Sequence, residues 1–469
     1  MNPRLSLALA AGRATRFITR RSGRGGTVLP GHIVRWIEPS VLQQITGALP
    51  HGTVLVSGTN GKTTTTRMLA SIVAASGLRP IHNRAGANLV SGIITATAEH
   101  ADLLGNPVGD IGVFEVDEAN VPAVVAATRP RILALTNLFR DQLDRYGEVE
   151  TVAQTWRTAI KNLNTGATLV LNADDPIVAQ LAELAPGRVV TFGLDDPTIG
   201  HAAVSHEADK RLCSRCGSRI LYERAYYGHL GHYRCPGCGW TRPTPDVAMI
   251  EVQERVAGIT RFTIQMGTES LPLALRLAGL YNVYNALAAA TIAHTVGIAT
   301  ADIAAGLAGS VAVFGRGEEI SVGPGVIVLA LVKNPVGFNE AIRGLLPARR
   351  PGNGDEPLPS ALIVAINDLF ADGTDISWLW DVNFEALAGG AERVIASGLR
   401  AEDVALRMKY AGMNEAVTSV VPAIEIAMDE AVACASRGGR VLALCSYTAM
   451  LAARRQLQRL GHVSPFWED

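Results

Sequence analysis

The sequence has almost no net charge and no long apolar run. Its 42 lysine and arginine residues balance 43 aspartate and glutamate residues, so the chain as a whole has no general attraction for nucleic acid. No apolar run approaches the ~20 residues that a membrane-spanning helix requires. Apolar residues still make up 48% of the 469 positions. This composition predicts a well-buried globular protein with two or three domains, because one core rarely serves so long a chain.

Cysteine is scarce, and most of it occurs in pairs. Four of the six cysteines, Cys213, Cys216, Cys235 and Cys238, form the pattern Cys-x2-Cys-x18-Cys-x2-Cys. Four thiolates predict a closed tetrahedral site for structural Zn²⁺, in an insertion over residues 206–242. Zinc ribbons often bind nucleic acid, but the neutral chain argues against that use here. The cysteine usage is typical of an intracellular protein and not of a secreted disulfide framework.

The first 21 residues, "MNPRLSLALAAGRATRFITRR", contain only a short apolar stretch. Arginines interrupt it at Arg13, Arg16, Arg20 and Arg21, and no small-residue cleavage site follows, so we do not expect a signal peptide. We expect a basic amphipathic helix and a linker over residues 1–45. This helix either packs on the first domain with its charges in solvent or touches an anionic membrane surface. The expected location is cytoplasmic, with at most peripheral contact with the inner face of the membrane.

From Val54 onward, apolar runs alternate with helical patterns. The runs "VLVSG", "IGVFEV", "ILALTN" and "ATLVLNADD" are typical of buried parallel strands separated by helices. We therefore expect an α/β protein with a central domain over residues 46–313. A second series of strands and helices begins near Gly323, with "GVIVLALV", "ALIVAIND", "RVIASG" and "RVLALCS". This series predicts a smaller α/β domain over residues 314–469.

The stretch "VLVSGTNGKTTTTRMLA" places a glycine-rich loop between a predicted strand and a predicted helix. Such a loop holds phosphates with its backbone N–H groups and the helix N-terminus. Lys62 would reach the β- and γ-phosphates of ATP, and the Thr63 hydroxyl would bind Mg²⁺. The predicted nucleotide-binding residues are Gly58, Thr59, Asn60, Gly61, Lys62, Thr63 and Thr64.

A cluster of acidic residues ends the next buried strand, in "FEVDEAN". The carboxyl ends of parallel strands meet at one edge of a sheet, so Glu115 and Glu118 should lie beside the phosphate loop. Carboxylates there would hold Mg²⁺. The alternative is a solvated acidic strand end without a ligand.

These stretches together resemble the Mur ligase family of ATP-dependent amide-forming enzymes. The loop is similar to the family's "GTNGKTT", and "GLYNVYNALAA" is similar to a segment whose first asparagine, here Asn282, approaches adenine. "FGRGE" is similar to the junction before the family's last domain, which implies that Arg316 reaches a phosphate once the domains close; a structural salt bridge is the alternative. The resemblance implies a P-loop ATPase central domain and a Rossmann-like C-terminal domain. Gln142 stands where most relatives have a metal-binding histidine.

Other stretches resemble the branch of that family that amidates lipid II, including "NRAGANLVSGI" and "DGTDISWLWDVNFE". The resemblance implies amidation of the α-carboxyl of D-glutamate in the stem peptide, with ammonia from a GatD-like glutaminase subunit. It also implies that an aspartate of the last domain completes the partner's Cys-His triad. We favour Asp375, with Asp381 and Asp372 behind it. Helix capping or a solvated loop is the alternative role for each.

Two other functions remain open from the sequence. A Mur-like ligase could add an amino acid instead of ammonia, as in folate polyglutamylation or cyanophycin synthesis. A nucleic-acid-dependent P-loop ATPase is the second alternative. Turnover that requires ammonia and no amino acid would distinguish the amidating ligase from the first, and the absence of stimulation by DNA or RNA would distinguish it from the second.

Overall fold

The computed structural model is described here for residues 2–21, 28–83, 87–140, 149–201, 211–256, 259–277, 279–310, 316–346 and 358–464. The chain forms two compact units. The first comprises the described residues up to Phe139, Val149–Arg276 and Leu280–Ser310, and the second is formed mainly by the chain that follows Ser310. The expected domain boundary, at residues 313 and 314, lies outside the described residues.

A nine-stranded sheet forms the centre of the first unit, in the order β11-β10-β9-β6-β5-β4-β1-β3-β2. Strands β1 to β6 are parallel to one another, and β9 pairs parallel with β6. Strands β10 and β11 extend the sheet beyond β9 with antiparallel pairs. Strand β1 is fully buried because helices cover both faces of the sheet, which explains its uninterrupted apolar sequence. The strands are β1 (Thr53–Ser57), β2 (Pro80–His82), β3 (Ile111–Glu115), β4 (Ile132–Leu135), β5 (Thr168–Asn172), β6 (Arg188–Leu194), β9 (Val247–Val256), β10 (Ile259–Met266) and β11 (Glu269–Leu275).

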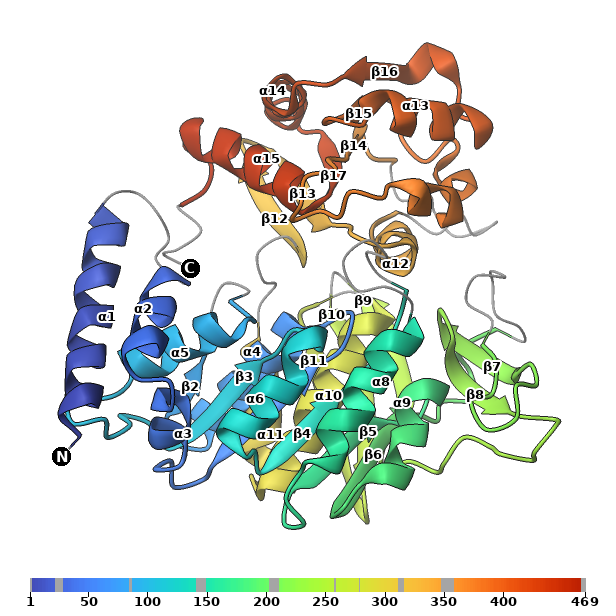
Figure 1. Ribbon diagram of the computed structural model, residues 1–469. Helices are drawn as coiled ribbons and strands as arrows, with labels where there is room; N and C mark the ends of the chain where they lie inside the picture. Colours follow the sequence, from blue (N-terminus) through green and yellow to red (C-terminus); the bar gives the residue numbers. More distant parts are fainter. Residues whose placement is uncertain are drawn as a thin grey trace. The chain divides into compact units, whose positions relative to one another are not determined.

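Helices α4, α10 and α11 pack together on one face of this sheet, and α6 and α8 pack on the other (Figure 1). The α-helices described in the first unit after its N-terminal segment are α3 (Val41–Thr46), α4 (Lys62–Ala75), α5 (Val90–Glu99), α6 (Val121–Thr128), α8 (Val149–Lys161), α9 (Pro176–Gln180), α10 (Leu280–Val296) and α11 (Thr300–Ala308).

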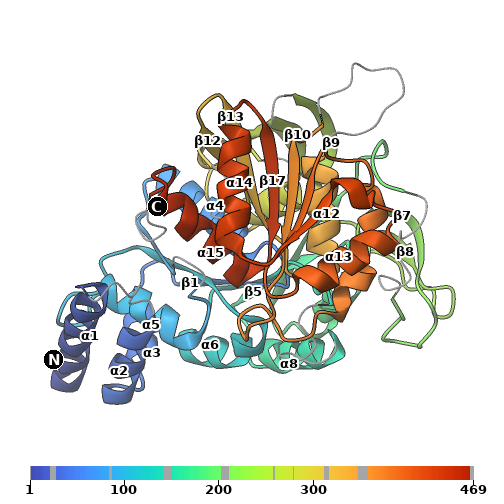
Figure 2. The ribbon, with the colours of Figure 1, turned by 90° about the horizontal axis from the view of Figure 1, so that it is seen from above.

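The N-terminal segment forms two neighbouring helices, α1 (Pro3–Arg21) and α2 (Leu29–Ile37), which lie side by side (Figures 1 and 2). Gly12 permits their close approach, since a Cβ there would lie 2.4 Å from a methyl of Val34. Arg16 pairs with Glu99 of α5, so α1 packs on the first unit. This segment is therefore part of that unit's packing.

The insertion forms a separate two-stranded antiparallel sheet, β7 (Leu221–Tyr227) and β8 (Leu230–Arg234). Within the first unit, it lies between β6 and β9 of the nine-stranded sheet. Residues 202–210, which include the start of the expected insertion, lie outside the described residues.

The second unit contains a six-stranded sheet in the order β12-β13-β17-β14-β15-β16. All pairs are parallel except β12 with β13. One core lies between the sheet and α12 and α13, and the other lies between the sheet and α14 and α15 (Figure 2). The elements are β12 (Arg316–Val322), β13 (Gly325–Leu331), α12 (Pro335–Leu345), β14 (Ala361–Ala365), η4 (Ser377–Asp381), η5 (Phe384–Leu387), β15 (Val394–Ser397), α13 (Ala401–Tyr410), β16 (Thr418–Val421), α14 (Ile424–Ala435), β17 (Arg440–Cys445) and α15 (Tyr447–Arg459).

Candidate functional site

The phosphate loop lies between the end of β1 and the first turn of α4. Gly58 and Gly61 have φ values of 151° and 84°, at which the backbone of any residue with a side chain is strained. Space also requires glycine: a Cβ on Gly58 would lie 2.1 Å from the Thr136 hydroxyl, and one on Gly61 would lie 2.0 Å from the Asn285 side-chain oxygen. The loop therefore wraps tightly at the N-terminus of α4, where N–H groups can bind an anion.

Lys62 is the first residue of α4, and its ammonium group is buried. The Nζ atom donates to the Gly58 carbonyl at 2.6 Å and to the Glu118 carboxylate at 2.9 Å. Burial alone would lower the pKa of Lys62, but the carboxylates of Glu118 and Glu115 outweigh burial and raise this pKa above its ordinary value. Lys62 is therefore held as a cation beside the loop.

The carboxyl end of β3 brings two acidic side chains to the same place. Glu115 and Glu118 are 3% and 4% exposed, so they do not form the solvated strand end that was the alternative. Within the described residues, the Glu115 Oε2 atom has no hydrogen-bond partner, and neither does the buried Thr64 hydroxyl. Buried oxygens without partners are costly unless a ligand satisfies them. These oxygens are the hard ligands that suit Mg²⁺.

Asn285 of α10 lies against Gly61 of the phosphate loop, and Asn282 lies one helical turn before it. Asn282 is buried and accepts a hydrogen bond from Asn285 at 3.3 Å. Asn285 in turn accepts one from the Thr65 hydroxyl of α4 at 3.3 Å. The sequence analysis selected Asn282 and missed Asn285, although both occur in "NVYN" at a spacing that places them on one helix face.

Asn137 is a second residue that the sequence analysis missed. It follows β4, and its side chain accepts from the Asn60 N–H at 2.8 Å and donates to the Asn60 carbonyl at 2.9 Å. Its carbonyl accepts from the Thr59 N–H at 3.0 Å. This pairing fixes the first half of the phosphate loop. Its position directly after a buried parallel strand was the available signal.

The four cysteines of the insertion come together. Their sulfur atoms all lie within 4.8 Å of one another, with 3.7 Å between Cys213 and Cys238 and 3.4 Å between Cys216 and Cys235. All four are free thiols. A tetrahedral ion with metal–sulfur bonds of ~2.3 Å would separate its sulfurs by roughly 3.8 Å. The cluster therefore has the size of a four-thiolate metal site.

Two matching turns build this cluster. The N–H of Gly217 donates to the Cys213 carbonyl at 2.7 Å, and the N–H of Gly239 donates to the Cys235 carbonyl at 3.0 Å; both glycines have a φ of 74°. Hydrogen bonds from Ser218 lower the pKa of the Cys216 thiol to about 6. The Trp240 N–H favours a thiolate at Cys238, but desolvation and the neighbouring sulfurs outweigh it and raise that pKa to about 11. Neighbouring thiolates repel one another, so a cation between them would favour their full ionisation.

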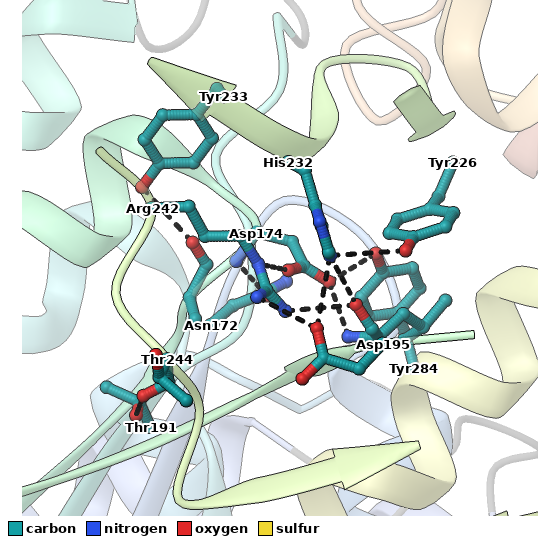
Figure 3. Close-up of polar contacts among 12 residues, drawn as sticks. Asn172, Asp174, Thr191, Asp195, Tyr226, His232, Tyr233, Arg242, Thr244 and Tyr284 are labelled. Atoms are coloured by element: carbon teal, nitrogen blue, oxygen red, sulfur yellow. Dashed lines mark hydrogen bonds and ion pairs between the residues drawn. The ribbon is translucent and has the colours of Figure 1, made fainter. Parts of the chain in front are cut away.

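Ionic contacts join the insertion to the rest of the first unit, and the sequence analysis did not anticipate them (Figure 3). Arg242 donates through Nε to Asp174 at 2.5 Å and through an Nη atom to Asp195 at 3.0 Å. Asp174 also accepts from the Tyr284 hydroxyl at 2.7 Å. His232 of β8 lies 3.1 Å from Asp195. Burial raises the pKa of Asp174 despite the opposing effect of Arg242.

The three candidate aspartates of the second unit have different surroundings. Asp372 is buried, and its two oxygens accept from the backbone N–H and the hydroxyl of Thr448, at 2.7 and 2.5 Å. It therefore fixes the start of α15. Asp375 is half-buried, and one of its oxygens accepts from the Ser377 N–H at 2.8 Å. Asp381 is the last residue of η4 and is half-buried.

The remaining candidate positions are less fully described. Arg316 begins β12, but its side chain lies outside the described residues. Gln142 also lies outside them. Thr63 is half-buried in the first turn of α4, next to Lys62.

Two family models match this chain. The Mur ligase middle domain matches residues 56–221, and the MurT ligase C-terminal domain matches residues 331–450. The chain is 36% identical over 416 residues to the subunit MurT of the glutamine-hydrolyzing lipid II isoglutaminyl synthase of Streptococcus pneumoniae, covering 88% of each chain. The chain belongs to the MurT family. The resemblance to Mur ligases seen in the sequence is thus confirmed.

Another MurT subunit, from Staphylococcus aureus (strain N315), is 31% identical over 459 residues, which are 96% of this chain and 97% of that one. Membership of the MurT family, with its Mur ligase domains, makes the protein an ATP-dependent ligase. The solved structure of a pseudomurein peptide ligase type C from Methanothermus fervidus matches with a TM-score of 0.69 and 24% identity, over 90% of this chain and 80% of that one. At that identity the match shows a shared fold.

The fold expectation is confirmed for its α/β, Mur-ligase-like part. The four cysteines are clustered, whereas the zinc itself stays a prediction. Among the helices in the described ranges, none is both long enough and apolar enough to cross a bilayer.

Proposed function

We propose that this chain is the synthetase subunit of a lipid II isoglutaminyl synthase. It amidates the α-carboxyl of D-glutamate in the stem peptide of lipid II and thereby acts in peptidoglycan synthesis. Two relatives that bear this name share more than 30% identity over most of the chain. The observation that carries the ATP-dependent step is the phosphate loop, with Lys62 buried beside Glu115 and Glu118 and two buried oxygens nearby that lack partners.

The proposed reaction has two steps. An oxygen of the substrate carboxylate attacks the γ-phosphorus of ATP, and the bond to the β–γ bridging oxygen breaks, which gives an acyl phosphate and ADP. Ammonia then attacks the acyl carbon, and the carbon–oxygen bond to phosphate breaks. The products are a primary amide and inorganic phosphate, and the ammonia nitrogen loses a proton. Lys62 and the loop N–H groups contribute by positioning the phosphates and neutralising their charge.

We propose that the nucleotide is ATP, held by the residues from Gly58 to Thr64. Thr63, Glu115 and Glu118 would hold Mg²⁺, which would screen the phosphate charge. The partnerless oxygens of Glu115 and Thr64 support a cation in this place. Asn282 and Arg316 remain proposals for contacts with adenine and phosphate. The four cysteines would hold structural Zn²⁺, for which their sulfur spacing fits.

Ammonia is proposed to come from a separate glutaminase, a GatD-like subunit. Cys434 and Cys445 are the cysteines outside the insertion. Burial raises the pKa of the Cys445 thiol to about 12, so this thiol is not a nucleophile at neutral pH. Cys434 lies on α14, with its sulfur packed close to Gly439. Neither position supports a glutaminase within this chain, and the relatives are named as subunits of a glutamine-hydrolyzing enzyme.

The carboxyl edge of the second sheet offers a surface for that partner. Phe370 is 80% exposed and Leu399 is 58% exposed, and they follow the neighbouring strands β14 and β15. Elsewhere on the second unit, Trp380 of η4 and Tyr410 of α13 are also exposed and form an edge-on ring pair, 5.6 Å between centroids. Large exposed aromatic side chains of this kind are typical of protein interfaces. Asp375 lies in the loop that follows β14, and we propose that it orients the partner's histidine.

Helix α1 supports peripheral contact with an anionic membrane, where a lipid-linked substrate would be found. Its 19 residues contain five arginines and no acidic residue. Leu7, Phe17 and Ile18 are between 62% and 66% exposed on this helix. Arginines beside exposed apolar side chains suit the surface of an anionic bilayer. We therefore propose a location on the cytoplasmic side of the membrane, which the cysteine usage also supports.

Release of ADP by the purified chain tests the ligase step. With lipid II and ammonium salts, the chain should release ADP, and amino acids should not replace ammonia. DNA or RNA should not stimulate the release. Release that requires an amino acid in place of ammonia would instead support the amino-acid-adding Mur ligases.

A further inference from the structure

The segment from Asn137 to Phe139 is held against the phosphate loop on one of its sides. Beyond the contacts of Asn137, the Phe139 N–H donates to the Thr59 hydroxyl at 3.0 Å, and this hydroxyl donates to the Phe139 carbonyl at 3.3 Å. Thr59 is 2% exposed. The position of this segment therefore fixes the position of the first half of the loop.

The four-cysteine insertion holds the same segment from the other side. The Leu138 N–H donates to the Asp175 carboxylate at 2.8 Å. The same carboxylate oxygen lies 3.1 Å from Nε2 of His229, which is at the turn between β7 and β8. The side chains of Asp175 and His229 are both fully buried. The ring of His229 also packs edge-on against Phe139, with 4.6 Å between centroids.

The partners of His229 define its tautomer. Nδ1 lies 3.2 Å from an Nη atom of Arg211, which is two residues before Cys213. A guanidinium can only donate, so this contact assigns the acceptor role to Nδ1 and a proton to Nε2. That proton points to Asp175. Arg211, beside the cysteine cluster, thus orients His229. His229 in turn fixes the Asp175 carboxylate that accepts from the Leu138 N–H.

We propose that His229 is a positioning residue for nucleotide binding, and that the insertion clamps residues 137–139 against the phosphate loop. This inference rests on the proposed ATP site. It gives the four-cysteine cluster a function beyond its own folding: the cluster supports the turn that carries His229. Loss of the clamp lets residues 137–139 move and weakens their hold on Thr59 and Asn60 of the loop.

The test compares two polar replacements that differ in reach. In His229→Gln, the amide nitrogen can still donate to Asp175, whereas the shorter side chain of His229→Asn cannot reach it. Tyr233→Phe is the matched control, because its lost hydroxyl joins the same insertion to the first unit through the Ala173 carbonyl at 3.1 Å. Each full-length variant is checked for bound metal and for cooperative unfolding. The dissociation constant for ADP with Mg²⁺ is then measured by calorimetry.

We expect His229→Asn to weaken ADP binding about tenfold, in the range of losses seen when supporting hydrogen bonds are removed. His229→Gln should recover most of this loss, and Tyr233→Phe should stay within about twofold of the wild type. In turnover, KM for ATP should rise in His229→Asn while KM for ammonia stays unchanged. A role in folding alone would not raise KM for ATP while leaving KM for ammonia unchanged.

Three results would overturn the proposal. In the first, metal-loaded His229→Asn binds ADP like the wild type. In the second, Tyr233→Phe loses as much affinity as His229→Asn, which would indicate general loosening. In the third, His229→Gln is as weak as His229→Asn. Failure of the wild-type chain to bind ADP would have a different meaning, because it would remove the proposed ATP site and this inference with it.

Discussion

Lys62 is the residue whose loss should affect ATP-dependent turnover most directly. Its ammonium is the buried cation beside the loop, so Lys62→Ala should lower ATP-dependent turnover by at least about a hundredfold, the usual cost of losing a group that stabilises developing charge. The change also leaves Glu118 buried without its partner, which typically costs about 3–5 kcal/mol of stability. ADP release and thermal unfolding measure the two effects.

The double variant with Glu118→Gln separates stability from chemistry. Neutralising Glu118 removes the unpaired buried charge, so this variant should regain much of the stability lost by Lys62→Ala. It should not regain turnover. Near-normal turnover of either variant would contradict the assigned role of the phosphate loop.

Asp375 is the residue whose proposed role concerns the partner. In Asp375→Asn, the complex with the glutaminase should still form, because the exposed apolar surface is unchanged. Glutamine hydrolysis should fall by orders of magnitude, as with other carboxylates that orient a catalytic histidine. Amidation driven by a high concentration of ammonium salt should continue, since Lys62 lies in the other unit.

Asp372 and Asp381 serve as comparisons for this experiment. Asp372→Asn should mainly lower the unfolding temperature, because both of its oxygens bind Thr448. Asp381→Asn should have little effect on hydrolysis. If Asp375→Asn retains glutaminase activity, or loses amidation with both nitrogen sources, the triad role belongs to another residue or does not exist.

At the scale of elements, the four-cysteine insertion should contain one zinc per chain. Cys213→Ser should lose this metal and destabilise the insertion, because a closed four-thiolate site contributes directly to folding. Metal analysis and unfolding of the purified protein measure both effects. A wild-type chain purified without chelator and containing well under one zinc per molecule would argue against a zinc site.

Helix α1 should bind vesicles that contain phosphatidylglycerol. Replacing both Phe17 and Ile18 by serine should reduce cosedimentation with these vesicles several-fold, and high salt should reduce binding of the wild type. Ile426→Ser is a suitable control, because this residue is 54% exposed but lies on α14. Equal binding by all three proteins would leave α1 as a solvated helix packed on the first unit.

Local patterns predicted the elements that short stretches of sequence determine. The strand, the glycines and Lys62 of the phosphate loop are adjacent in the chain, and the pairs of cysteines have a spacing fixed by tight turns. Contacts between distant segments were not predictable in the same way. Asn285 reaches Gly61 from α10, and Arg242 reaches Asp174 through the fold of the insertion. No pattern in the sequence around Asn285 or Arg242 specifies which distant residue each of them contacts.

The aspartates of the second unit show a related limit. "DGTDISWLWD" offers several carboxylates of equal appearance, and only the contact with Thr448 reveals that Asp372 caps α15. In the first unit, the sequence assigns no role to His229, which lies between the two pairs of cysteines. Its role emerges only when Asp175, Leu138 and the phosphate loop are seen together.

At the scale of the whole molecule, the residues proposed for the two tasks lie in two units. The first unit carries the phosphate loop, the carboxylates of β3 and the four-cysteine insertion, and the second unit carries the exposed aromatic surface and Asp375. This division predicts that ammonium salts can replace the partner. The chain alone should amidate lipid II with ammonia and ATP but should not use glutamine.

The most direct test of the whole account uses lipid II, ATP and glutamine labelled with ¹⁵N in its amide group. The purified chain is assayed with and without its co-purified glutaminase subunit, and the stem peptide is analysed by mass spectrometry. The account predicts that only the pair converts the α-carboxyl of D-glutamate to a ¹⁵N amide, with one ADP formed per amide. An unmodified stem peptide despite ATP hydrolysis by the pair, or a product that carries an added amino acid, would contradict it.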